Sequence, residues 1–313
     1  MKVTVVGAGA LGGYFGLRLL EAGNDVNFLV RERRGGQLEE EGLGLISPYG
    51  DYKADHLQIY TNADQIKECD LVFLSVKGYH LQGVLPQLKI LAAKGAYILP
   101  VLNGIEHLSI LQEACGEDKV LGGLAFIIAT LDDKGHVCHT SSQHDFIIGG
   151  LDEKQRAVCD RLAKAAEQAN INVAVSATIL TELWKKYTFI TAFSGITTAS
   201  RLTIGPIREN EALTNLSIEV LQEMTQLAKA YHVDLTDIMP QAGAEQIKSF
   251  PDEATSSMHQ DFRKGLPLEV DHLLGGALRL ANKRSLKIPH IETIHALLKP
   301  YEHGRQERTA IDI

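Results

Sequence analysis

Three glycines near the start of the chain have the spacing that binds a phosphate-bearing nucleotide. They belong to a G-x-G-x-x-G turn made of Gly7, Ala8, Gly9, Ala10, Leu11 and Gly12. A β-branched run at 3–6 predicts a buried strand before the turn, and apolar residues at helical spacing predict a helix after it. In that context the first glycine allows the tight turn, the second lets the backbone approach a pyrophosphate, and the third lets helix and strand pack closely. The alternative is an ordinary strand–turn–helix connection.

The charge that follows the second expected strand, at 25–30, indicates which dinucleotide would bind. Arg31 follows that strand, with Arg33 and Arg34 close behind. An acid at this point binds the ribose 2′-hydroxyl of NAD, whereas an arginine can bind the 2′-phosphate of NADP with two hydrogen bonds. Arg31 therefore favours NADP(H). The alternative is a solvated charge cluster on a loop.

Lys186 lies within the apolar stripe of a helix that we expect over 178–193. On a wheel of 3.6 residues per turn it shares its side with Ile179, Leu183, Phe189, Ile190 and Phe193. Lys185 instead shares its side with Thr181 and Thr188. An ammonium group among apolar side chains is costly without a partner, and burial lowers its pKa, which suits a proton donor near pH 7. The alternative is a lysine that reaches solvent and pairs with Glu182, one turn earlier.

Two polar residues follow apolar strands in the first half of the chain. Lys77 follows the run at 71–76, and Asn103 follows the run at 96–102. Ligands of open α/β sheets bind at the carboxyl ends of the strands, so both side chains are candidates for contacting the nucleotide. The alternatives are a lysine that leaves a strand for solvent and an ordinary Asn-Gly turn.

Further polar residues stand before expected helices in the second half. Ser257 precedes Gln260 by three residues, and Glu269 follows Pro267, which we expect to open a helix. Ser257 with Gln260 fits a capping box, and Glu269 fits the acid that a helix dipole favours in the first turn. These structural roles are the alternatives to a catalytic or ligand-binding role for the two residues.

The elements that must position these residues predict an α/β fold in two domains. We expect a Rossmann-type dinucleotide-binding domain over 1–176 and an all-helical domain over 177–313. In the first, Pro100 predicts an edge or bulged strand. Strands at 120–130, 137–139 and 145–148 predict an antiparallel extension of the sheet, and a helix at about 154–169 with a strand at 172–175 closes the domain.

The helical domain has its own boundary signals. We expect Gly195 to end the helix that carries Lys186, and a long helix over 212–232. Pro289 and Pro300 bracket the final helix, and the polar tail after His303 is expected to fray.

Composition excludes several classes of partner. The 313 residues carry a net charge of −8 with no large basic cluster, so neither nucleic acid nor an anionic membrane is expected as a partner. No apolar run has the length that a bilayer requires, and no signal peptide precedes the first strand. The four cysteines and twelve histidines lack metal-ligand spacing, and we interpret His139 and His144 as surface residues. We expect reduced cysteines and a cytoplasmic protein.

These blocks together resemble the ketopantoate reductase family (2-dehydropantoate 2-reductases). They follow the family's order from Met1 to about Pro300: V-x-G-A-G-A-L-G-G at 5–13, Arg31, S-V-K at 75–77, L-N-G at 102–104, E-L-W-K-K at 182–186, S-S-M-H-Q-D at 256–261 and E-V-D at 269–271. The glycine motif is shared by many families. The E-L-W-x-K block and the S-S-M-x-Q-D block with a later E-x-D are far more specific.

The resemblance implies an NADPH-dependent reductase that converts 2-dehydropantoate (ketopantoate) to pantoate in the pantothenate and coenzyme A pathway. It implies that Lys186 protonates the carbonyl oxygen as hydride arrives, supported by Glu269. The implied cofactor site consists of Gly7, Ala8, Gly9, Ala10, Leu11, Gly12, Arg31, Lys77 and Asn103. The implied substrate site consists of Asn103, Lys186, Ser194, Ser257 and Glu269. The candidate partners are thus a small 2-keto acid and a second copy of this chain.

Three positions depart from the family's pattern. The family usually has asparagines four and eight residues after its catalytic lysine, where this chain has Ile190 and Ser194, and Thr255 stands where another family asparagine often occurs. These residues leave the proton donor in place but make the substrate pocket more apolar, which changes what the pocket discriminates. Two alternatives stay open: a reductase of another small 2-keto or β-hydroxy acid on the same scaffold, and an NADPH-sensing protein without turnover.

Overall fold

The computed structural model describes residues 1–235 and 239–304. It divides into two compact units, each with its own core. The N-terminal unit comprises Met1–Leu102 and His107–Leu180, and the helical unit comprises Asn103–Glu106 and the chain from Thr181 onward. We expected a boundary between residues 176 and 177. The tail after His303, which we expected to fray, lies outside the described residues apart from Gly304.

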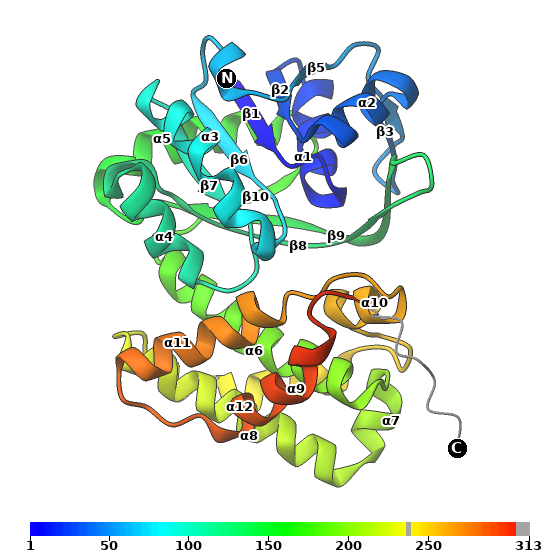
Figure 1. Ribbon diagram of the computed structural model, residues 1–313, viewed down its shortest axis with the longest axis vertical. Helices are drawn as coiled ribbons and strands as arrows, with labels where there is room; N and C mark the ends of the chain where they lie inside the picture. Colours follow the sequence, from blue (N-terminus) through cyan, green and yellow to red (C-terminus); the bar gives the residue numbers. More distant parts are fainter. Residues whose placement is uncertain (236–238, 305–313) are drawn as a thin grey trace. The chain divides into compact units, whose positions relative to one another are not determined.

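A five-stranded parallel sheet forms the first layer of the N-terminal unit (Figure 1). Its order is β5-β2-β1-β6-β7, with bounds β1 Lys2–Val6, β2 Asp25–Leu29, β5 Gln58–Tyr60, β6 Leu71–Leu74 and β7 Tyr97–Pro100. The apolar residues of β1 and β6 are buried, as expected of central parallel strands. Pro100 ends β7 at the sheet's edge, where a missing N–H is tolerated, so its predicted edge position is confirmed.

Five α-helices belong to the described part of the N-terminal unit, the first four after strands of this sheet and the fifth after the second sheet's long strand at 137–149. They are α1 Ala10–Glu21, α2 Glu32–Glu41, α3 Leu81–Ala93, α4 Glu106–Cys115 and α5 Arg156–Glu167. The expected strand–turn–helix order around the glycine turn is confirmed, because β1 leads through the turn directly into α1.

The second sheet corrects one expectation. The strands expected at 137–139 and 145–148 are a single strand, β9 Val137–Gly149, which pairs antiparallel with β8 Gly122–Leu131. They form a separate sheet rather than an extension of the first, because β9 also pairs with β3 Gly44–Ile46 and β10 Asn172–Val175. The short β4 Tyr52–Lys53 completes it.

The core of the N-terminal unit packs α1 against both sheets. Phe15 of α1 lies 5.4 Å from Phe73 of β6 and 4.9 Å from Phe146 of β9, measured between ring centroids. All three rings are buried, and pairs at this separation stabilise a core beyond their buried area. This packing fixes the start of α1 next to the carboxyl end of β1.

His139 and His144 are buried, so their interpretation as surface residues was wrong. The hydroxyl of Ser47 lies 2.9 Å from His139 Nδ1, and that of Tyr14 lies 3.0 Å from His144 Nδ1. The Tyr49 ring stacks on His144 at 3.8 Å. Burial lowers the pKa of both histidines, which therefore serve the core as neutral rings.

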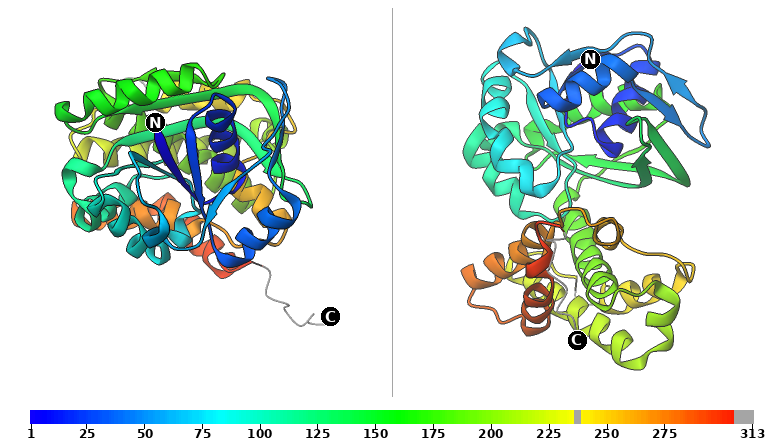
Figure 2. Two further views of the ribbon diagram at one scale, coloured as in Figure 1. Left: turned by 90° about the horizontal axis from the view of Figure 1, so that it is seen from above. Right: turned by 45° about the vertical axis from the view of Figure 1, so that its right-hand side comes forward.

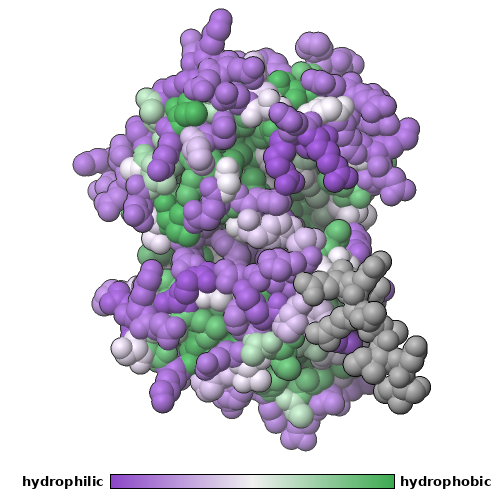
Figure 3. All heavy atoms as spheres, viewed as in Figure 1, coloured by the Kyte–Doolittle hydropathy of each residue, from purple (hydrophilic) through white to green (hydrophobic). Residues whose placement is uncertain are grey.

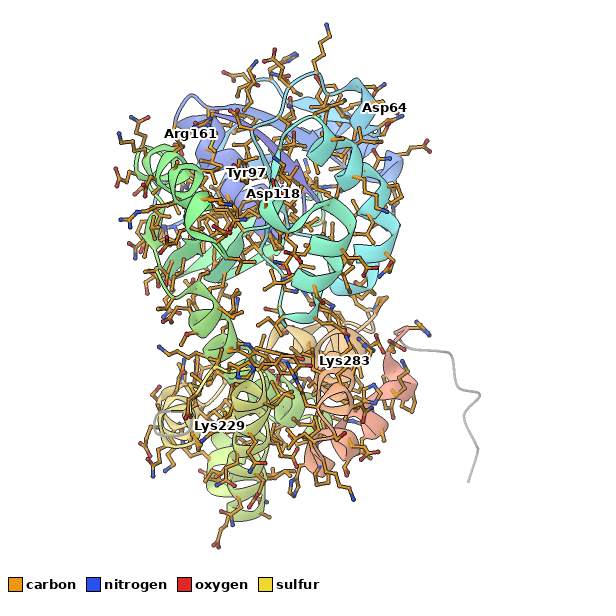
Figure 4. The ribbon with its side chains drawn as sticks, turned by 90° about the vertical axis from the view of Figure 1, so that its left-hand side faces the viewer. Asp64, Tyr97, Asp118, Arg161, Lys229 and Lys283 are labelled. Carbon is orange, nitrogen blue, oxygen red and sulfur yellow. The ribbon has the colours of Figure 1, made fainter. Side chains whose placement is uncertain are left out.

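The helical unit is built around α8 Glu211–Ala230, whose Val220, Leu221, Met224 and Leu227 are buried. The other helices shown in Figures 1 and 2 are α6 Ile179–Ser200, α7 Ile204–Glu209, α9 Met239–Ser249, α10 Ser257–Arg263, α11 Gly276–Lys283 and α12 Pro289–Leu298. Figure 4 labels Lys229 and Lys283, which lie in the last turns of α8 and α11, where a cation offsets the helix dipole.

Two expected helix boundaries were wrong. Gly195 lies inside α6, and a Cβ there would lie 3.3 Å from Ile294 of α12, so this glycine permits close packing rather than a stop. Pro267 precedes its helix instead of opening it. The chain becomes helical at Val270 and runs through a π-helical turn, η5 Asp271–Gly275, into α11. Pro289 does open α12, as predicted.

The surface in Figure 3 is mostly hydrophilic, with apolar side chains in small groups. Within residues 1–235 and 239–304, no helix combines the length and apolar character needed to cross a bilayer.

Candidate active site

The glycine turn has a geometry that larger residues could not adopt. Gly7 has φ +95°, a conformation that favours glycine. A Cβ on Gly12 would lie 2.1 Å from the Gly7 carbonyl oxygen and 2.2 Å from Ser75 Oγ. Gly12 therefore lets α1 approach the end of β1, the role predicted for the third glycine.

Two carbonyl groups of this turn accept hydrogen bonds from protein side chains. Ser75 Oγ donates to the Gly7 carbonyl at 2.8 Å, and Arg34 Nε donates to the Ala8 carbonyl at 3.0 Å. A Cβ on Gly9 would meet no protein atom within 4 Å. The first turn of α1, at Ala10–Gly12, begins beside this open position, and first-turn amides have no partner within their helix. Such a turn can bind a diphosphate.

A cavity of about 670 Å³ lies where β2 ends. Its lining residues are Arg31, Glu32, Arg33, Thr61, Asn62 and Gln87. Two guanidinium groups against one carboxylate make it suited to a phosphate monoester. Arg34 does not line it, since its guanidinium binds the Ala8 and Gly135 carbonyls and Gln37. The turn and the cavity together fit a dinucleotide that carries a 2′-phosphate.

Lys77 and Asn103 both follow strands of the parallel sheet, as predicted, but belong to different units. Lys77 is half-buried in the N-terminal unit, at the start of the turn Gly78–His80 after β6. Asn103 groups with the helical unit, and its carbonyl accepts a hydrogen bond from His272 Nε2 at 2.7 Å. Lys77 thus lies at the strand ends that carry the glycine turn, whereas Asn103 is held by helical residues.

Lys186 has the environment that its helical stripe predicted. It is half-buried, and its neighbours Leu183, Trp184 and Tyr187 are buried. Burial lowers its pKa from 10.5 to about 8, and the Glu269 carboxylate partly opposes that effect. Glu182 bonds to Lys185 at 3.1 Å, so the charge that acts on Lys186 comes from Glu269 rather than from the neighbouring turn.

Glu269 is a buried residue that directly precedes the helical stretch beginning at Val270. Its side chain is only 9% exposed, and its carbonyl accepts a hydrogen bond from the amide of Leu273 at 2.9 Å. An ammonium of lowered pKa beside a buried carboxylate can transfer a proton near neutral pH.

The remaining predicted residues have distinct places in the helical unit. Ser194 is buried on α6, two turns beyond Lys186, and Ile190 lies half-buried between them. Ser257 is exposed in the first turn of α10. Its proposed capping box was wrong, because Ser256 is the N-cap: its Oγ accepts from the His259 amide and contacts Thr197 Oγ1 of α6 at 2.9 Å.

Sequence reasoning missed three residues that hold the candidate groups: Arg34, Tyr187 and His272. Their partners lie 26, 86 and 169 residues away along the chain. Local patterns do not report such contacts. Only Arg34 carried a signal, as a member of the arginine cluster after β2.

Comparisons with known proteins show the family to which the chain belongs. The family model described as ketopantoate reductase PanE/ApbA matches residues 3–153, and the model of its C-terminal region matches residues 178–302. The oxidoreductase YkpB of Bacillus subtilis, described as uncharacterized, is 35% identical over 302 residues, which cover 96% of this chain and 99% of YkpB. A 2-dehydropantoate 2-reductase of Pyrococcus abyssi is 28% identical, covering 96% of this chain and 98% of the relative.

Solved structures share the fold over the same length. A PanE/ApbA family ketopantoate reductase from Ralstonia eutropha JMP134 matches with a TM-score of 0.85 and 25% identity, covering 96% of this chain and 98% of its own. A D-mandelate dehydrogenase with NADH and anilino(oxo)acetate matches with a TM-score of 0.87 and 23% identity over the same shares. The chain has the two-part architecture of these enzymes and a half-buried lysine near a buried carboxylate, and it is an oxidoreductase that belongs to the ketopantoate reductase family.

Proposed function

We propose that this protein reduces the ketone of a 2-keto acid with NADPH, and that 2-dehydropantoate, reduced to pantoate, is its substrate. The observation that carries the proposal is Lys186, half-buried on α6 with a pKa near 8 and acted on by the buried Glu269. The family membership and the 2-dehydropantoate 2-reductase relatives support the choice of substrate.

When bound, NADPH supplies the hydride, and the protein must supply the proton. Lys186 Nζ donates that proton to the substrate oxygen as negative charge develops there. Glu269 favours the ammonium form of Lys186 and so keeps the donor charged before reaction. The side-chain amide of Asn103 orients the carbonyl, and Ser257 in the first turn of α10 binds the substrate carboxylate, as the family resemblance implies.

The cofactor preference rests on the N-terminal unit. The turn Gly7–Gly12 binds the diphosphate, and Arg31 with Arg33 binds the 2′-phosphate in the cavity that they line. Lys77, at the end of β6, contacts the ribose or phosphate that passes over the strand ends.

The test is NADPH oxidation with a panel of 2-keto acids, comparing Lys186→Gln with Lys185→Gln. The two lysines are adjacent and lose the same charge, but Lys185 bonds to Glu182 away from the apolar stripe. We expect Lys186→Gln to lose roughly a hundredfold or more in kcat, within the usual range for general acids, and Lys185→Gln to stay near wild type. Equal losses in both variants would remove Lys186 from the mechanism.

Ile190 and Ser194 favour a second candidate substrate, a more apolar 2-keto acid. Both follow Lys186 at intervals of four residues on α6, and neither offers the amide that the family pattern supplies. In the same panel, a kcat/KM for another 2-keto acid that exceeds that for 2-dehydropantoate would replace the proposed substrate. Tight NADPH binding with no turnover of any acid would instead favour the sensing protein.

The role in the pantothenate and coenzyme A pathway follows from the proposed substrate. The cytoplasmic location and a homodimer stay predictions. A ketopantoate reductase from Staphylococcus aureus, similar in fold, is described as dimeric. The molar mass of this protein in solution tests the same assembly here.

A further inference from the structure

The segment Asn103–Glu106 is held at both ends by one stretch of the helical unit. At its start, His272 Nε2 donates to the Asn103 carbonyl at 2.7 Å. At its end, Arg279 Nε lies 3.0 Å from both carboxylate oxygens of Glu106, and Arg279 also binds Asp271 at 3.1 Å. Between the two ends, Gly104 adopts φ +77°, so the segment turns sharply at a residue that tolerates this conformation.

His272 belongs to the same helical turn as Glu269. The Leu273 amide donates to the Glu269 carbonyl, which makes residues 269–273 one turn. Glu269 directly precedes the helical stretch that begins at Val270, and His272 lies within it, three residues after Glu269. The imidazole that holds Asn103 and the carboxylate that acts on Lys186 therefore belong to one short hydrogen-bonded stretch, 269–273.

Tyr187 joins this turn to α6. Its hydroxyl donates to the Leu273 carbonyl at 2.6 Å, and Tyr187 directly follows Lys186. Tyr187 is buried, and burial together with the Glu106 charge raises its pKa, so the hydroxyl stays protonated and continues to donate.

We infer that His272 is a positioning residue for reduction: it holds the Asn103 backbone so that the Asn103 amide faces the carbonyl that Lys186 protonates. His272 donates to the Asn103 carbonyl, and the Leu273 amide donates to the Glu269 carbonyl. The Tyr187 hydroxyl donates to the Leu273 carbonyl, and Tyr187 directly follows Lys186. This inference rests on the proposed reductase function for its kinetic consequence. The restraint on residues 103–106 is independent of it.

The test compares His272→Phe with His272→Gln in the full-length protein. Phenylalanine keeps a ring but removes the donor, whereas glutamine places an amide N–H near the position of Nε2. We expect His272→Phe to lower kcat roughly tenfold to a hundredfold, since small misplacements of positioning groups cost that much. KM for NADPH should stay near wild type, and His272→Gln should retain most of the activity. His56→Phe, at an exposed histidine of the N-terminal unit, is the control for the exchange itself.

A double-mutant cycle separates positioning from general damage. Asn103→Ala removes the amide but keeps the carbonyl, so adding His272→Phe to it should cost little more. If the two losses multiply instead, His272 does not act through Asn103, and the inference is wrong.

Hydrogen exchange measures the restraint without any substrate. Peptides covering 103–106 should exchange faster in His272→Phe than in wild type or His272→Gln, and Arg279→Gln, which releases Glu106, should act in the same direction. Unchanged exchange in His272→Phe would overturn the inference. A wild-type protein that reduces no 2-keto acid would defeat the proposed function, while the exchange result would still decide the restraint.

Discussion

Lys185 and Lys186 are neighbours in the chain, yet their environments give them different chemistry. The Lys185 side chain is partly exposed and forms an ion pair with Glu182, of the kind that contributes little to stability. Lys186 lies in the apolar stripe, where burial lowers its pKa to about 8. The hundred-degree rotation between successive helical residues produces this difference.

The pKa of Lys186 predicts how the reaction depends on pH. The proton donor must be charged, so the reduction rate should fall as pH rises through about 8. Glu269 raises that pKa, so Glu269→Gln should move the fall to lower pH. Glu182→Gln is the control, because Glu182 pairs with Lys185. The measurement is a pH–rate profile of kcat; a fall that stays in place, or moves to higher pH, in Glu269→Gln would refute the pairing.

Arg31 predicts selectivity between the two nicotinamide cofactors. Arg31→Glu should weaken NADPH binding about tenfold to a hundredfold, the usual range for a hydrogen bond to a charged group, and change NADH binding little. Lys164→Glu, an equal charge change at an exposed residue of α5, should affect neither. Fluorescence titration with both cofactors measures this, and equal weakening for NADPH and NADH would show that Arg31 does not bind the 2′-phosphate.

At the scale of elements, the turn between β1 and α1 shows how a short motif depends on its neighbours. Gly12 faces the Gly7 carbonyl and Ser75, whereas Gly9 faces open space. Within one motif, Gly12 thus permits close packing, whereas Gly9 leaves space for a ligand to approach the backbone. Gly195 also serves packing: it lies inside α6, and its missing side chain leaves room for Ile294 of α12.

This division predicts opposite results for two alanine substitutions. Gly12→Ala should lower the free energy of unfolding by about 1–3 kcal/mol, the usual cost of overpacking, because the turn must open. Gly9→Ala should leave stability unchanged, since φ there is −79°, and should weaken NADPH at least about tenfold. Thermal unfolding followed by circular dichroism, together with NADPH titration, distinguishes the two. A Gly9→Ala protein that binds NADPH normally would contradict the assignment of the turn.

At the scale of the whole molecule, the candidate residues separate by unit. The glycine turn, Arg31 and Lys77 belong to the N-terminal unit, whereas Asn103, Lys186 and Glu269 belong to the helical unit. The chain crosses between units at 102/103, 106/107 and 180/181, so the segment with Asn103 is a short insertion of the helical unit into the N-terminal sequence. The glycine turn and Arg31, proposed to bind the cofactor, thus belong to a different core from Lys186 and Glu269, proposed for proton transfer.

That separation predicts that the two functions can be impaired independently. Lys186→Gln should abolish most turnover while its dissociation constant for NADPH stays within about twofold of wild type. Gly9→Ala should weaken NADPH, yet at saturating NADPH its kcat should still fall as pH rises through about 8. A large loss of NADPH affinity in Lys186→Gln would show that the two sites are not separable.

The sequence alone determined the features that depend on local periodicity. The run before Gly7, the arginine after β2 and the stripe around Lys186 each follow from residues within one or two turns of one another, and all three predictions of position were confirmed. Pro100 at a sheet edge belongs with them, because a missing N–H has the same consequence in any sheet.

Only the tertiary structure decided the features whose partners lie far along the chain. His272 and Asn103 are 169 residues apart, and no local pattern joins them. The single strand β9 and the buried His139 and His144 likewise depend on contacts with distant elements. A helical or strand pattern in the sequence shows which residues lie on one face of that element. The groups that each side chain contacts depend on how separate elements pack against one another.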